Sequence, residues 1–251
     1  MNRMVSEKEI SVDYRKKIYS KYRTVQALPP KIDFGAADRW GQAYEVWLRG
    51  WLPEDKHSKI LDVACGNGLL LRFFNRNGYD DLEGVDLSEE QLTAAKQICG
   101  NIHEKNAIEF LASRAGEYDL ICSIDLVEHL YKDEFMDFLE NAYGALKPGG
   151  RIILQTPNCG SPFGIVQRYS DFTHETGFTP QTLGGLLGLA GFQEVEAREQ
   201  GPVIRGVKSL LRSLLWKIIS AGFKVIDLVE TGASKSIYTR VFVISAKKPG
   251  A

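Results

Sequence analysis

The sequence has few of the features that mark secreted, metal-stapled or membrane-spanning proteins. Its 251 residues hold four cysteines and no CxxC pair: Cys65, Cys99, Cys122 and Cys159. Their spacing favours neither a zinc site nor a disulfide framework, so we interpret them as small buried side chains in a reducing compartment. The N-terminal residues lack the apolar core of a signal peptide, and no uncharged apolar run is long enough for a spanning helix. We therefore expect a cytoplasmic protein.

The chain also lacks an excess of charge of either sign. Its 31 basic and 32 acidic residues give a formal net charge of −1. Dedicated nucleic-acid binders carry strongly basic surfaces, because binding neutralises phosphates. Nucleic acid is therefore not an expected partner. The hydrophobic share of 44% is ordinary, and a chain of this length can bury a full core without staples.

From residue 60 onward, strand-like and helix-like segments alternate. Strands are expected at residues 60–64, 82–86, 102–107, 118–124, 151–156, 192–198 and 238–246. Helices are expected at residues 69–75, 88–98, 133–146 and 179–190, with Ser88 as an N-cap and Gly191 as a C-cap. This alternation predicts an α/β fold, with a doubly wound, Rossmann-like and mostly parallel sheet.

Two further helices precede this pattern. Residues 7–27 carry apolar side chains at helical spacing and end before the Pro29-Pro30 pair, and residues 37–52 form a second helix. We expect an N-terminal helical cap over residues 1–56 and one domain over 57–251.

A helical insertion is expected at residues 201–236, before the last strand. Within residues 203–229, apolar residues recur at helical spacing and Lys and Arg fall mainly on the other face. This stretch could be a lid or a homodimer face that buries its apolar side against protein. It could instead contact a membrane surface or a lipid-linked substrate.

A glycine-rich loop follows the first predicted strand. In Asp62-x-Ala64-x-Gly66-x-Gly68, the two glycines allow a tight turn and the close approach of a ligand to the backbone. The loop does not supply the G-x-G-x-x-G pattern of ordinary dinucleotide sites. Without a ligand it would be a simple strand-to-helix turn.

Asp86 ends the second predicted strand. A carboxylate there can accept hydrogen bonds from both hydroxyls of a ribose. The alternative is that Asp86 only caps the helix that follows.

Four segments together resemble the class I S-adenosylmethionine-dependent methyltransferases, of the type 11/12-like kind. They are Leu-Asp-Val-Ala-Cys-Gly-Asn-Gly at 61–68, Gly-Val-Asp-Leu-Ser at 84–88, Tyr-Asp-Leu-Ile-Cys-Ser at 118–123 and Leu-Lys-Pro-Gly-Gly-Arg-Ile-Ile-Leu at 146–154. The resemblance covers roughly residues 58–200 and the final strand. It implies a seven-stranded sheet with the last strand antiparallel, and an enzyme with S-adenosylmethionine as cofactor.

The resemblance also implies where the cofactor lies. The loop at 64–68 would contact its methionine part, Asp86 its ribose, and Asn106-Ala107 its adenine. Ala64 departs from the usual first glycine, and Asn106 from a frequent Asp. The expected cofactor-binding residues are Asp62, Ala64, Gly66, Asn67, Gly68, Asp86, Leu87, Asn106, Ala107 and Ser123.

A polar cluster, Asp125-Leu-Val-Glu128-His129, follows the fourth predicted strand, where ligands bind in parallel sheets. Asp125, Glu128 and His129 could converge on one divalent ion, Mg or Mn, with His174 as a fourth ligand. The arrangement is similar to the Glu-x-x-Glu-His cluster and later His of metal-assisted small-RNA 2′-O-methyltransferases, and to the cluster of ubiquinone-pathway O-methyltransferases. Asp125 stands where the first Glu would be. In the alternative, the Glu-His pair orients a substrate or caps a helix without metal.

The same cluster bears on the methyl acceptor. A hydroxyl is a poor nucleophile at neutral pH and needs a general base or a metal. His174, His129 and Asp125 are the candidate catalytic residues, with the histidines as bases, although His129 could also be a core residue. We expect an O-methyltransferase acting on a hydroxyl of a sugar or glycan, in a surface polysaccharide or a glycosylated metabolite. The alternatives are a small-molecule N- or C-methyltransferase, an inactive cofactor-binding partner subunit, or a peripheral membrane adaptor.

Overall fold

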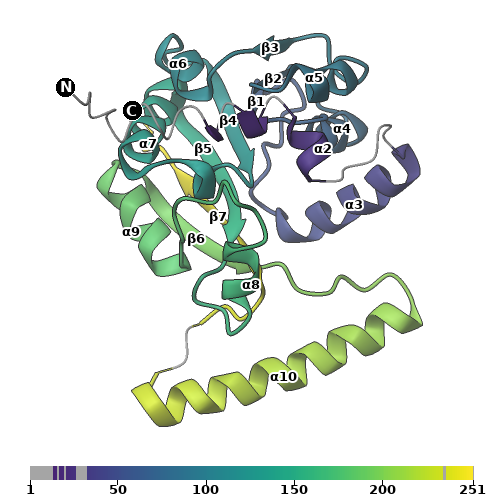
Figure 1. The fold of residues 1–251 in the computed structure, drawn as a ribbon, viewed down its shortest axis with the longest axis vertical. Helices are drawn as coiled ribbons and strands as arrows, with labels where there is room; N and C mark the ends of the chain where they lie inside the picture. The colour runs from purple at the N-terminus through teal and green to yellow at the C-terminus, as the bar shows by residue number, and fades with distance from the viewer. Residues whose placement is uncertain (1–13, 16, 20, 27–32, 234–235, 251) are drawn as a thin grey trace, which may run out of the picture.

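The computed structural model describes residues 14–15, 17–19, 21–26, 33–233 and 236–250. Its centre is a seven-stranded sheet in the order β3-β2-β1-β4-β5-β7-β6 (Figure 1). The strands from β3 to β5 pair in parallel, and β7 runs antiparallel to both of its neighbours. The predicted fold class is confirmed. The strands are β1 Ile60–Val63, β2 Leu82–Asp86, β3 Ile102–Glu104, β4 Tyr118–Ile124, β5 Leu146–Pro157, β6 Gln193–Glu199 and β7 Val241–Lys247.

Helices cover both faces of the sheet. One buried cluster joins the sheet to α3, α4 and α5, and a second joins it to α6, α7 and α9. Neighbouring residues of a strand serve opposite clusters, as Leu120 and Ile121 do, because side chains alternate along a strand. The helices are α2 Tyr22–Val25, α3 Phe34–Trp47, α4 Leu69–Arg76, α5 Glu89–Ala95, α6 Ala107–Ala112, a 3₁₀ turn η1 Val127–His129, α7 Lys132–Ala145, α8 Gly164–Arg168, α9 Pro180–Leu189 and α10 Val207–Thr231.

The third strand is shorter than predicted. It ends at Glu104, because the Asn106 side chain accepts hydrogen bonds from Ile108 N at 2.9 Å and Glu109 N at 3.3 Å and so caps α6. The expected strand over 105–107 was wrong, and the short helix α6 was missed. An amide at this position favours a helix start over a continued strand.

The two predicted capping residues, Ser88 and Gly191, both lie at helix ends in the structure. Ser88 is the residue before α5, but its side chain makes no capping bond, and its backbone N–H donates to Asp86 instead. Gly191 follows α9 with a φ of +96°, which suits glycine.

The N-terminal helical segment is described only in part. Residues 14–15 and 17–19 are helical, and α2 continues the segment to Val25. The rest of the predicted helix at 7–27, and the Pro29-Pro30 pair, lie outside the described residues. The next helix, α3, begins three residues earlier than predicted, because Asp33 accepts a hydrogen bond from Ala36 N at 3.0 Å and caps it.

The predicted insertion is the 25-residue helix α10, which lies between β6 and β7. It lies outside the layers of helices that cover the sheet, and two extended connections lead to and from it (Figure 1). Among the described residues, no helix is both long enough and apolar enough to cross a membrane.

Candidate active site

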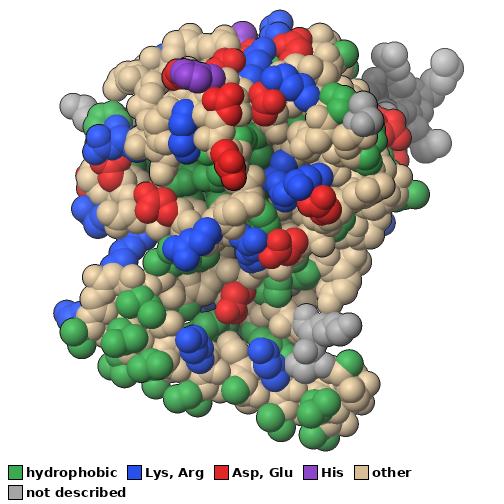
Figure 2. All heavy atoms as spheres, turned by 180° about the vertical axis from the view of Figure 1, so that it is seen from behind, with side chains coloured by type: hydrophobic (Ala, Val, Ile, Leu, Met, Phe, Trp, Pro, Cys, Tyr) green, Lys and Arg blue, Asp and Glu red, His purple; other side chains and the backbone are tan. Residues whose placement is uncertain are grey.

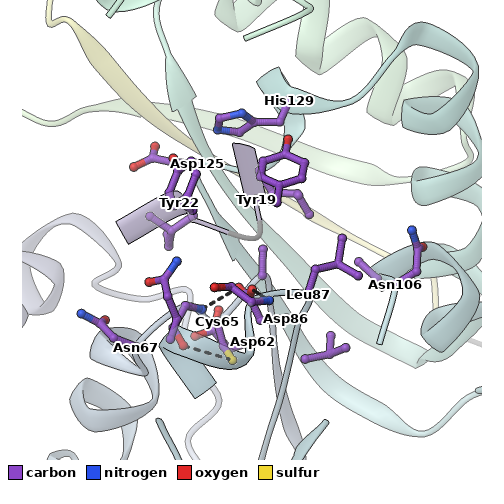
Figure 3. A pocket seen from close by; sticks show the side chains of 18 of the residues that line it. Tyr19, Tyr22, Asp62, Cys65, Asn67, Asp86, Leu87, Asn106, Asp125 and His129 are labelled. Carbon is purple, nitrogen blue, oxygen red and sulfur yellow. Dashed lines mark hydrogen bonds between the residues drawn. The ribbon is translucent and has the colours of Figure 1, made fainter. Parts of the chain in front are cut away.

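A cavity of about 400 Å³ opens at the carboxyl ends of β1, β2 and β4 (Figure 3). Loops that follow parallel strands meet at this edge, so residues distant in sequence share one wall. Eight of the ten expected cofactor-binding residues line it: Asp62, Ala64, Gly66, Asn67, Asp86, Leu87, Asn106 and Ala107.

The loop after β1 adopts left-handed backbone conformations at three positions. The φ angles are +58° at Ala64, +52° at Gly66 and +84° at Gly68. Gly68 does not line the cavity. A Cβ there would come within 3.0 Å of the Cα of Ala95, so this glycine lets the start of α4 pack closely on α5. Gly66 faces the cavity and Gly68 supports the loop from behind.

Asp86, at the end of β2, links the loop after β1 to the loop after β2 through hydrogen bonds. Its Oδ2 accepts a hydrogen bond from Gly66 N, and its Oδ1 accepts one from Ser88 N, both at 2.8 Å. Burial raises the pKa of Asp86, and backbone N–H donors oppose that rise. Because each carboxylate oxygen can accept a second hydrogen bond, Asp86 can hold the loop and still bind hydroxyls.

Asp62 lies beneath the same loop. The side chain is 2% exposed, and burial, together with the neighbouring Asp86, raises its pKa well above the usual value. Burial thus disfavours the charged form of Asp62.

Ser123, like Gly68, is an expected cofactor-binding residue that does not line the cavity. It is fully buried in β4, and its Oγ donates to the carbonyl oxygen of Val63 at 2.9 Å. The hydroxyl thus pairs with the neighbouring strand and does not reach the cavity wall.

The cavity residues that sequence reasoning missed include Arg15, Tyr19, Tyr22 and Trp40. Tyr19 and Tyr22 lie beside Asp125 and His129 in the cavity (Figure 3), and both rings pack edge-on against the His129 ring. The available signal was the three-residue spacing of the two tyrosines in the predicted first helix, which puts them on one face.

His129 belongs to a hydrogen-bonded chain. Its Nδ1 lies 2.8 Å from the Thr173 hydroxyl, which itself donates to Asp171 Oδ1 at 2.7 Å. Because that hydroxyl proton is already committed, Nδ1 of His129 must donate, and Nε2 keeps its lone pair. Burial, and then His174, lower the pKa of His129 to about 4, so the ring is neutral at pH 7.

His174 reaches the same cluster from the loop between α8 and α9. Its Nδ1 lies 3.1 Å from the carbonyl oxygen of Gln167 and 3.2 Å from that of Arg168. A carbonyl only accepts, so Nδ1 of His174 carries a proton and donates it. Nε2 of the same ring lies 4.0 Å from Glu128 Oε1.

Glu128 completes a group that could hold a metal ion. One ligand atom from each of Glu128, His129 and His174 lies within 4.8 Å of the others. Glu128 Oε2 accepts from Thr156 Oγ1 at 2.9 Å, whereas the buried Oε1 accepts no hydrogen bond from the described residues. Burial, and then Asp125, raise the pKa of Glu128 well above its usual value.

Asp125 lies outside this three-residue group. It has a φ of +53°, and its Oδ1 accepts from Gln155 Nε2 at 3.0 Å. The Gln155 side-chain oxygen in turn accepts hydrogen bonds from the Tyr44 hydroxyl and from Gln200 Nε2. These hydrogen bonds hold the Gln155 amide in place, and the amide in turn holds Asp125. Asp125 and His129 line the cavity, whereas Glu128 and His174 lie behind its wall. The structure thus brings together three of the four predicted metal ligands.

Comparison with known proteins places these features in a family. A family model described as "Methyltransferase domain" matches residues 38–197, which run from within α3 to within β6 and include most of the cavity wall.

Curated relatives match over part of their length. The chain is 31% identical over 107 residues to a protein of Acinetobacter baylyi named "Ubiquinone biosynthesis O-methyltransferase", across 40% of this chain and 44% of that protein. A Coxiella burnetii protein of the same name is 32% identical over 108 residues, across 41% and 45%. The match thus spans less than half of each relative.

Solved structures share the fold. A SAM-dependent methyltransferase from Archaeoglobus fulgidus superposes with a TM-score of 0.63 at 22% identity, covering 83% of this chain and 94% of that one. A putative methyltransferase from Haloferax volcanii, in complex with the activator Trm112, gives 0.61 at 16% identity, covering 86% and 93%.

Proposed function

Since the chain belongs to the methyltransferase-domain family, we propose that it is an S-adenosylmethionine-dependent O-methyltransferase acting on a hydroxyl of a sugar or glycan. The observation that carries this proposal is a neutral His129 with an unprotonated Nε2 on the wall of the cavity that the glycine loop and Asp86 also line. The name of the curated relatives supports an oxygen acceptor.

In this proposal the strand ends hold the cofactor. Asp86 accepts the ribose hydroxyls, the loop at 64–68 lies along the methionine part, and Asn106 and Ala107 flank the adenine. The backbone of the loop at 64–68 is already held by Asp86 and by the close packing at Gly68. It therefore loses little conformational freedom when the cofactor binds.

His129 supplies the base. As the acceptor oxygen attacks the methyl carbon, the carbon–sulfur bond breaks and its electron pair stays on sulfur, which becomes a neutral thioether. His129 Nε2 takes the hydroxyl proton, and the new product is a methyl ether. Thr173 and Asp171 stabilise the resulting imidazolium through Nδ1.

Aromatic residues support a sugar acceptor. Tyr19, Tyr22 and Trp40 bring flat apolar faces with polar tips to the same cavity. The net charge of −1 favours a sugar over RNA.

A divalent metal ion is a second candidate for activating the hydroxyl. Glu128, His129 and His174 fit one, because a buried carboxylate oxygen that accepts no hydrogen bond from the described residues and two imidazoles are suitable ligands. Such an ion would lower the pKa of a bound hydroxyl. His129 Nε2 cannot both ligate an ion and take a proton, so metal binding and base catalysis by His129 are alternatives.

The acceptor proposal is tested with methyl-labelled S-adenosylmethionine and a panel of glycans, phenols and amines. We expect label in a sugar, with NMR showing an O-methyl ether. Transfer only to nitrogen or carbon would overturn the O-methyltransferase assignment, and transfer only to phenols would overturn the sugar.

A further inference from the structure

An ordinary surface helix buries its apolar side and exposes its polar side, whereas α10 exposes its more apolar side to solvent. Its less exposed side carries Ser209, Ser213, Trp216, Ser220, Phe223 and Asp227, at helical spacing. This side makes the contacts with the body: Trp216 Nε1 donates to Glu199 at 3.3 Å, Tyr238 donates to Asp227 at 2.5 Å, and the Phe223 ring packs against Phe163. Three serines and an aspartate thus face the protein.

The opposite side of α10 is apolar and exposed. We call Val207, Leu211, Leu214, Ile218, Val225 and Val229 the apolar stripe, because their spacing places them along one line of the helix. Their side chains are 49% to 84% exposed. Soluble monomers rarely expose an apolar surface as long as this stripe, which extends about 33 Å from Val207 to Val229 at 1.5 Å per residue.

Basic residues border the apolar stripe. At 100° per residue, Lys217 and Lys224 lie along one edge and Lys208 and Arg212 along the other, and all four are exposed. Of the two acidic residues in α10, Asp227 faces the body and Glu230 lies in the last turn. Figure 2 shows hydrophobic side chains along the lower edge of the molecule, with Lys and Arg above them.

We propose that α10 is a docking helix that lies in the plane of an anionic lipid surface. The apolar stripe enters the boundary between headgroups and acyl chains, and the cations on both edges contact lipid phosphates. A second copy of the chain fits less well, because pairing two stripes brings four like charges on each helix toward those of the other. Lipid binding by α10 does not depend on methyl transfer.

The test uses the full chain and flotation with two kinds of vesicle: phosphatidylcholine alone, and phosphatidylcholine mixed with phosphatidylglycerol. We expect flotation with the mixed vesicles and its loss at high salt. Ile218→Glu should lower the lipid partition coefficient by at least about tenfold, since it places a carboxylate at the middle of the stripe. The matched control is Leu189→Glu on α9, where the native side chain is 73% exposed, and it should bind like wild type.

A second variant replaces Lys208, Arg212, Lys217 and Lys224 with Gln. We expect it to lose the preference for phosphatidylglycerol. Unchanged thermal unfolding of both variants shows that the body is intact. Wild type that fails to float with mixed vesicles, or an Ile218→Glu variant that floats as well as wild type, overturns the proposal. So does light scattering that shows a dimer dissociated by Ile218→Glu, without vesicle binding.

Discussion

The rings of His129 and His174 meet edge to face, with centroids 4.7 Å apart, and each ring commits its Nδ1 proton to a fixed neighbour. Only His129 lines the cavity. The two histidines, predicted together as bases, therefore have different positions: His129 faces the cavity, and His174 lies behind the cavity wall beside Glu128.

Replacing these histidines separates their roles. His129→Asn should lower kcat by about 10²–10⁴-fold, the usual contribution of a general base, and leave the affinity for S-adenosylmethionine unchanged. His174→Asn should have a smaller effect in the absence of metal. His57→Asn is the control, since the exposed His57 ring does not line the cavity and, among the described residues, pairs only with Asp80. Steady-state kinetics with the identified acceptor measure this, and equal losses for His57 and His129 would contradict it.

Metal binding has a readout of its own. If Glu128, His129 and His174 hold an ion, calorimetry with Mn²⁺ should show one site, and Glu128→Gln should weaken it at least about tenfold, as loss of a charged ligand does. Asp133→Asn, on the exposed first turn of α7, is the control. Full activity in chelator together with no heat of Mn²⁺ binding would leave His129 as the base and exclude the metal.

The pKa of His129 predicts a pH dependence of stability. The ordinary histidine pKa is about 6.5, and the folded value is lowered to about 4. The unfolded chain therefore binds more protons between these values, and stability is full above pH 6.5 and lost as the pH falls toward 4. From pH 7 to pH 5 this single group should cost about 2 kcal/mol.

The measurement is guanidinium unfolding of wild type and His129→Asn at both pH values. Buried carboxyls with raised pKa, such as Asp62 and Glu128, act in the opposite direction in both proteins, so the difference between them isolates His129. A variant with the same pH dependence as wild type would refute the lowered pKa.

The two alanine variants Gly68→Ala and Gly78→Ala should differ. Both glycines have a φ near +85°, but an added Cβ would meet Ala95 at 3.0 Å from Gly68 and nothing within 4 Å from Gly78. Backbone strain alone costs about 1–2 kcal/mol in each. The additional clash should make Gly68→Ala less stable by a further 1–3 kcal/mol or so. Equal midpoints in guanidinium would show that Gly68 is not needed for the packing of α4 on α5.

Strand positions were the most predictable part of the fold. The observed bounds of β2 and β4 equal the predicted ones, because apolar runs buried on both faces end where polar residues begin. Burial on both faces also explains why the orientation of Ser123 was not predicted. A strand that is buried on both faces shows no alternation, so the sequence could not tell which side chain points at the cavity.

Long-range contacts explain what sequence reasoning missed in the site. The Tyr22 hydroxyl donates to Asp171 across 149 residues of chain, and no local pattern predicts such a pair. Periodicity likewise predicted a helix at 203–229, but it could not show that serines and Asp227 would face the body while the apolar stripe faces outward.

The central claim is that the cavity at the ends of β1 and β2 holds S-adenosylmethionine through Asp86, and calorimetry with S-adenosylhomocysteine tests it most directly. Hydrogen bonds to a carboxylate contribute about 1.5–3 kcal/mol each, so the loss of even one in Asp86→Ala should weaken binding by about 10- to 150-fold, and the loss of both by more. Asp86→Asn, which can still accept from Gly66 N or Ser88 N, should fall between this variant and wild type. Glu104→Gln, at the exposed end of the neighbouring strand β3, should bind like wild type. No binding by wild type, or equal binding by Asp86→Ala, would contradict the account.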